Sequence, residues 1–167
     1  MKKISIIIIL LSLFVITGCE KSNKVIVNGQ KINTSKMEHK HCTREAVATD
    51  GEPVLEYDLY YTNDKLNILV SKEKMISSNE KVLDTYEEAY TKIKDYYKEI
   101  ENYDTKIERD NNSVTYTATV DYSKIDISKL IKLEGEEDNI FENKVPKVEK
   151  WLSLAKKFGT KCKLVEE

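Results

Sequence analysis

The hydrophobic period of residues 39–165 changes several times, and these changes constrain the fold more than any other feature of the chain. Apolar and polar side chains alternate in several segments, and a period of two predicts strands with one buried face. The clearest of these segments are residues 55–61, 66–70, 105–109 and 114–122. Turn residues separate neighbouring segments at Asn63-Asp64 and Asn111-Asn112, so these strands are predicted to pair as antiparallel hairpins.

Another strand is predicted at the start of this region, and one at its end. The first runs from His39 through Cys42 to Thr49 and is followed by Asp50-Gly51, a strong hairpin signal. The closing strand covers residues 161–165 and carries Cys162.

Helical periods interrupt the strands three times. Residues 85–102 place apolar side chains at every third or fourth position, with Thr85 and Glu88 as a capping box. A short helical segment is predicted to begin at Asp126, and a third helix to begin at Pro146 and stop at Gly159.

Runs of strands with helices between them predict the α+β class. We expect an antiparallel sheet of about five to six strands with two main helices packed on one face. Residues 39–167 are predicted to form this single domain.

The N-terminal residues have the layout of a secretory signal peptide. Two lysines precede an apolar run from Ile4 to Ile16, which is too short for a typical membrane-spanning helix. Ile16-Thr17-Gly18-Cys19 resembles the bacterial lipobox, which implies cleavage between Gly18 and Cys19 and a diacylglycerol thioether on Cys19. Residues 1–18 are therefore predicted to be removed, and the protein to be lipid-anchored in the cell membrane, facing the extracellular side.

Residues 19–38 are predicted to be the lipidated cysteine and a flexible tether, because Lys, Asn, Ser and Gln dominate them. The alternative is a small hairpin, since Val25-Ile26-Val27 precedes the turn signal Asn28-Gly29.

The charge of the mature chain argues against nucleic acid as a partner. Removal of Lys2 and Lys3 leaves a net charge of (27 − 2) − 29, or −4, and nucleic-acid-binding domains are basic. The membrane is then a partner only through the covalent lipid on Cys19.

With Cys19 lipidated, Cys42 and Cys162 remain, and an exported domain favours their pairing. A disulfide between them would close a loop of about 120 residues and join the last strand to the first. The alternative is two separate buried thiols.

His39 and His41 are weak candidates for a metal site. They lie on one side of a strand, and Cys42 lies on the other, so a third ligand would have to come from elsewhere in the chain. Two exposed polar side chains are the favoured interpretation. The acidic residues 134–138 lack the ligand spacing of a calcium loop and are predicted to be solvated.

No combination of residues predicts catalysis. Both histidines lie in one strand, there is no Cys-x-x-Cys pair, and no glycine-rich phosphate loop is present. We therefore expect neither an enzyme nor a cofactor.

Several segments resemble the YehR-like bacterial lipoproteins. Besides the lipobox, they are Cys42-Thr43-Arg44, residues 86–89 (Tyr-Glu-Glu-Ala), Asp121-Tyr122 with Asp126, and the ending Gly159-Thr160-Lys161-Cys162. The resemblance covers residues 39–165 and implies an exported, lipid-anchored α+β domain without an established activity or catalytic residues. The expected disulfide rests on this sequence and not on the resemblance.

The expected role is a non-enzymatic binding or interaction module that meets an envelope protein or a small ligand. The alternative is a lipoprotein that captures a metal or a small molecule, at His39 and His41 or in a pocket between a helix and the sheet.

Overall fold

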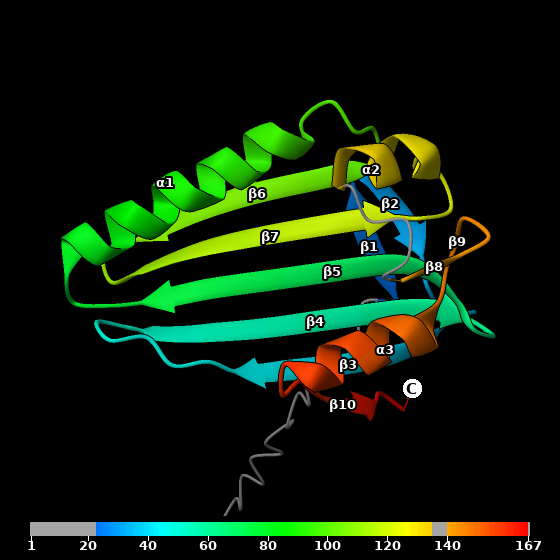
Figure 1. Ribbon diagram of the computed structural model, residues 1–167, viewed down its shortest axis with the longest axis horizontal. Coiled ribbons are helices and arrows are strands. Elements are labelled where there is room, and N and C mark those ends of the chain that lie inside the picture. The colour runs from blue at the N-terminus through cyan, green and yellow to red at the C-terminus, as the bar shows by residue number, and fades with distance from the viewer. Residues whose placement is uncertain (1–22, 135–139, 167) are drawn as a thin grey trace, which may run out of the picture.

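Six antiparallel strands form one sheet in the computed structural model of the chain, which describes residues 23–134 and 140–166 (Figure 1). The spatial order of the strands is β10-β3-β4-β5-β7-β6. Their bounds are Glu38–Glu45 (β3), Glu52–Thr62 (β4), Lys65–Ile76 (β5), Tyr103–Asp110 (β6), Ser113–Asp121 (β7) and Lys161–Leu164 (β10). Each predicted strand is present, but β3 ends at Glu45, four residues before the predicted end at Thr49, and β5 continues six residues beyond the alternation that predicted it, to Ile76.

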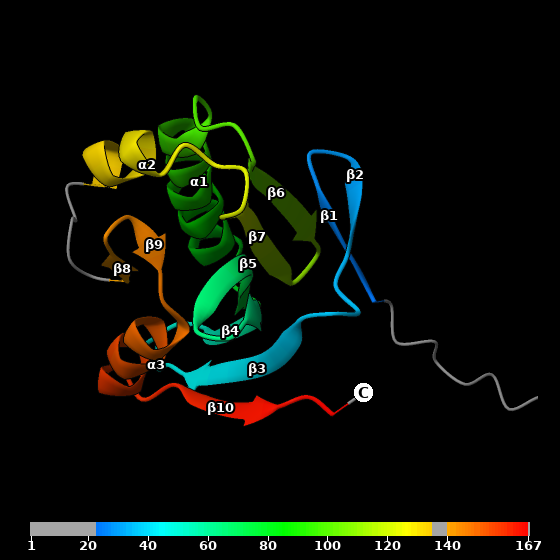
Figure 2. The same ribbon diagram turned by 90° about the vertical axis from the view of Figure 1, so that its right-hand side faces the viewer.

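The described helices all lie on one face of this sheet (Figure 2). They are α1 (Glu80–Tyr97), α2 (Ile127–Glu134) and α3 (Val148–Lys157). Val114, Tyr116, Ala118 and Val120 are successive inward-facing residues of β7, and each is at most 5% exposed. The first three pack with α1 and the fourth packs with α2 and α3. A single face of β7 therefore contributes to two hydrophobic clusters, one beneath α1 and one beneath α2 and α3. The predicted α+β class is confirmed.

The predicted start of α1 was wrong. The helix begins at Glu80, where the Asn79 side chain accepts a hydrogen bond from the backbone N–H of Lys81 at 3.1 Å. Thr85 lies inside the helix and donates to the carbonyl of Lys81 at 2.8 Å. The capping box was misplaced because Asn79 is a good N-cap and Leu83, at 1% exposure, supplies the first buried contact a turn earlier.

The predicted start of α3 was also wrong, whereas its end is confirmed. Pro146 belongs to a two-residue strand, β9 (Val145–Pro146), which pairs with β8 (Phe141–Glu142). Lys147 is the N-cap, and its N–H donates to the Ile140 carbonyl at 2.7 Å. This small hairpin holds Pro146 in extended backbone, so the helix starts later. Gly159, with φ of +79°, ends it.

Residues 24–33 form a hairpin on the opposite face of the sheet, so the predicted tether was too long (Figure 2). Strand β1 (Lys24–Val27) pairs with β2 (Gln30–Asn33), and Asn28 and Gly29 both adopt positive φ in the turn. Val25 and Val27 are buried against Ile68 of β5. This burial of apolar area is what makes the short hairpin stable.

Three parts of the sequence interpretation fall outside the described residues: the signal peptide, Cys19, and residues 135–138 of the acidic segment. Among the helices that the structure describes, none has the length and hydropathy needed to cross a bilayer.

Candidate functional site

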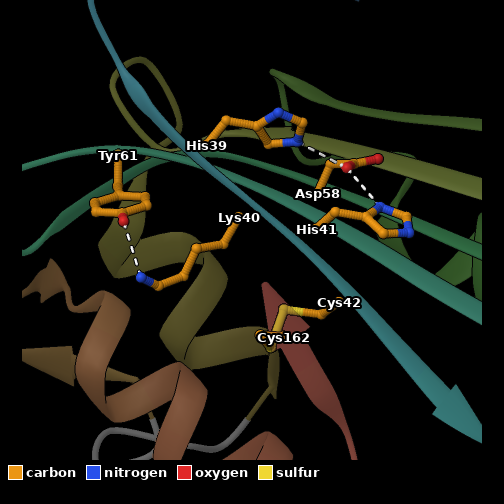
Figure 3. The surroundings of a disulfide bond; sticks show 7 residues. All are labelled: His39, Lys40, His41, Cys42, Asp58, Tyr61 and Cys162. Carbon is orange, nitrogen blue, oxygen red and sulfur yellow. Dashed lines mark hydrogen bonds and ion pairs between the residues drawn. A yellow bond between two sulfur atoms is a disulfide. The ribbon is translucent and has the colours of Figure 1, made fainter. Parts of the chain in front are cut away.

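A disulfide joins Cys42 of β3 to Cys162 of β10, as the sequence predicted, with an S–S distance of 2.08 Å (Figure 3). The two residues face each other directly in the antiparallel ladder. Cys42 is fully buried, whereas Cys162 belongs to an edge strand whose residues are all exposed. The bond therefore fixes the C-terminal strand to the interior of the sheet.

His39 and His41 lie on the opposite side of β3 from the disulfide (Figure 3). The Nε2 atom of His39 and the Nδ1 atom of His41 bond the same carboxylate oxygen, Oδ1 of Asp58, at 2.8 and 2.9 Å. The His39 ring also stacks on Tyr60 at 4.4 Å between centroids. The predicted same-side placement is confirmed.

The sequence analysis missed Asp58 as the partner of both histidines. Asp58 lies opposite His41 in the neighbouring strand, so its role depends on the register between β3 and β4. Within residues 23–134 and 140–166, no group of three or more His, Cys, Asp and Glu side chains is placed to hold a metal ion. The two histidines are therefore held by hydrogen bonds to a single carboxylate oxygen.

A pocket of about 180 Å³ lies on the other face, between α3 and the sheet. Tyr57 of β4 meets Trp151 of α3 edge to face at 5.4 Å between centroids. Phe158, which is 61% exposed, stands at the end of α3. The lining residues are Arg44, Tyr57, Trp151, Leu154, Ala155, Phe158 and Thr160.

Arg44 and Glu73 are opposite charges on the same face of the sheet, on either side of Leu55. Arg44 pairs with Leu55 across β3 and β4, and Leu55 pairs with Glu73 across β4 and β5. Two strand spacings put their backbones about 10 Å apart. Within the described residues, neither side chain has a hydrogen bond or an ion pair, although both are partly buried.

Three tyrosines interact electrostatically with Glu73: Tyr57 of β4, Tyr90 of α1 and Tyr116 of β7. Tyr90 of α1 stacks on Tyr116 of β7 at 5.3 Å between centroids. Burial is the main cause that raises the pKa of Tyr57 and of Tyr90, and it raises the pKa of Tyr116 to about 12. These hydroxyls keep their protons at neutral pH, so they suit hydrogen bonding and aromatic contact rather than proton abstraction.

Sequence reasoning placed Trp151 and Phe158 on the apolar face of a helix but did not identify this pocket. The available signal was Arg44, a charged residue on the same side of its strand as Cys42, which faces the core. A charge in such a position favours a functional interpretation.

Replacing Glu73 with Gln is expected to raise the free energy of unfolding at pH 7 and to flatten its pH dependence. Burial raises the pKa of the Glu73 carboxyl above 4.5, and Arg44 only partly opposes this. A raised folded-state pKa stabilises the fold below the unfolded-state pKa, and that contribution is lost as the pH rises through the folded-state pKa. Urea unfolding between pH 4 and pH 8 measures the effect.

Glu45→Gln is the matched control, because the Glu45 side chain is 94% exposed. It should keep the wild-type pH dependence. A Glu73→Gln variant that is no more stable than wild type at pH 7 would contradict the burial of this carboxyl.

Two solved structures share the fold. The NMR structure of the Escherichia coli YehR protein has a TM-score of 0.58 and 17% sequence identity, covering 79% of this chain and 94% of YehR. An NMR structure of a Streptococcus pneumoniae protein has a TM-score of 0.50 and 15% identity, covering 98% of this chain and 99% of that protein. No protein-family model matches the chain, and no curated protein matches it in sequence. The expected likeness to YehR is confirmed at the level of fold.

Proposed function

We propose that this chain, which shares the fold of YehR, is an exported, lipid-anchored, non-enzymatic interaction module. It docks a partner polypeptide through the pocket beside α3. The pocket's lining is the observation that carries this proposal: it combines a tryptophan, a tyrosine and an arginine, the residue types that dominate binding energy at protein interfaces.

The size of the pocket favours a partner side chain over a separate small molecule. Sites for small ligands enclose roughly 300–1,000 Å³, whereas this pocket encloses about 180 Å³. It accepts one large side chain, with Phe158 at the rim to cover it.

Export is supported by two independent features. The first 19 residues have the signal and lipobox pattern, and the domain contains the Cys42–Cys162 disulfide. Disulfides persist outside the reducing cytosol.

A role without catalysis is supported by the positions of the titratable groups. The chain has two histidines, and both are bonded to Asp58 on the face of the sheet opposite the pocket. The groups beside the pocket are an arginine, a carboxyl with a raised pKa, and tyrosines that hold their protons. Such groups bind and orient a partner.

Docking is tested with the photoreactive residue p-benzoylphenylalanine at position 158, in cells that express the protein. Irradiation should give a crosslinked product of higher mass. The product should disappear with Trp151→Ala, provided that circular dichroism shows this variant folded, and it should persist with Trp151→Phe. Position 106, an exposed lysine of β6, is the control site. No product at 158, or equal products at both sites, would refute docking at this pocket.

A further inference from the structure

We infer that the pocket beside α3 recognises the C-terminal residue of its partner, taking an apolar side chain and pairing the adjacent terminal carboxylate with Arg44. This inference rests on the proposed docking function and names the chemistry of the occupant.

Arg44 supplies the charge for this recognition. It lines the pocket, is partly buried, and has no hydrogen bond or ion pair within the part of the chain that the structure describes. Removing a guanidinium from water without a partner is unfavourable, and its planar donors match a carboxylate in two parallel hydrogen bonds. An incoming carboxylate would supply hydrogen-bond acceptors, whereas Glu73 acts on Arg44 only through its charge.

The volume indicates that one residue carries both groups. At about 180 Å³, the pocket is smaller than the roughly 300–1,000 Å³ of typical small-ligand sites. Arg44 stands in the same small pocket as the rings of Tyr57 and Trp151. The anion and the apolar group must therefore be close together, as they are at a C-terminal residue. An internal Asp or Glu would place them on different residues.

Glu73 opposes an anion at this site and makes recognition pH-dependent. The groups that face Glu73 are Arg44 from β3, Tyr57 from β4, Tyr116 from β7 and Tyr90 from α1. When Glu73 is protonated, Arg44 keeps its charge and the repulsion disappears. Affinity for a carboxylate should therefore increase as the pH falls through the raised pKa of Glu73, while the terminal carboxylate of the probe, whose ordinary pKa is lower, is still ionised.

Trp151 is the single tryptophan of the chain, so its fluorescence reports on the pocket directly. The mature lipidated protein in detergent is titrated with the tripeptide N-acetyl-Gly-Gly-Phe and with the same peptide as its C-terminal amide. The acid should bind about tenfold more tightly, since a charge-assisted bidentate pair is stronger than a neutral hydrogen bond. Arg44→Gln should remove that difference.

Lys163→Gln is the matched control, because it removes an exposed positive charge from the face of the sheet that lies away from the pocket. It should keep the preference for the acid. Equal binding of acid and amide would overturn the carboxylate inference and leave docking intact. Binding of neither peptide would overturn the recognition of a C-terminal residue, whereas docking itself is refuted by the absence of a crosslink at position 158. If 3-phenylpropionate binds as tightly as the tripeptide, the carboxylate that the pocket recognises belongs to a small acid and not to the C-terminus of a polypeptide.

Discussion

Replacing Cys42 and Cys162 together with alanine is expected to lower the free energy of unfolding by about 3–5 kcal/mol. The disulfide spans 120 residues, and closing so long a loop removes much conformational freedom from the unfolded chain. Urea unfolding of the double variant against the oxidised protein measures the loss.

The same experiment has an internal control in the wild-type protein. Reduction of the disulfide should cause a loss of similar size, because it opens the same loop without changing a side chain. Thiol counting on the unreduced, unfolded protein should find no reactive thiol from Cys42 or Cys162. A loss below about 1 kcal/mol would show that the cross-link contributes little, as occurs when the unfolded chain retains structure.

Replacing Cys19 with Ser is expected to abolish lipid labelling and to release or mislocalise the protein. Each buried methylene of an acyl chain contributes about 0.8 kcal/mol, so two chains anchor stably and their loss leaves no comparable attachment. A chain cleaved before Cys19 would carry a net charge of −4, by the arithmetic (27 − 2) − 29, so attraction to anionic lipid would not replace the acyl chains. Membrane fractionation and metabolic labelling with a fatty acid measure the change.

Cys162→Ser is the matched control for that experiment, because it removes a cysteine but leaves the lipobox unchanged. It should keep both the label and the membrane association. If the Cys19→Ser variant keeps both as well, the protein is not a lipoprotein of this type.

The strands could be predicted because their period is set by which face of the sheet is buried. Val114, Tyr116, Ala118 and Val120 alternate in the sequence and pack on one face in the structure. Element ends are less predictable, since a cap depends on competition between nearby residues. Asn79, and not Thr85, is the N-cap of α1. Pro146 pairs with Phe141 in the β8–β9 hairpin and therefore lies before the start of α3.

The hairpin of residues 24–33 shows the limit of local patterns. Its two strands have four residues each, and alone they would be marginal in water. Their stability comes from contact with Ile68, which lies about 40 residues away in β5. Only the folded arrangement supplies that contact.

The pocket is unpredictable for the same reason. Arg44 and Trp151 are separated by more than a hundred residues and meet only because α3 lies over the edge of the sheet that contains β3 and β4 (Figure 1). The sequence showed an apolar helix face and a charge on a strand, but not that the two share a surface.

The β1 strand begins at Lys24, only five residues after Cys19. A fully extended chain of that length spans at most about 18 Å. A lipid on Cys19 would therefore confine the domain to a thin layer at the bilayer surface. Partners attached to the same membrane would be met by two-dimensional diffusion at a high effective concentration, so even a weak pocket would be occupied for much of the time.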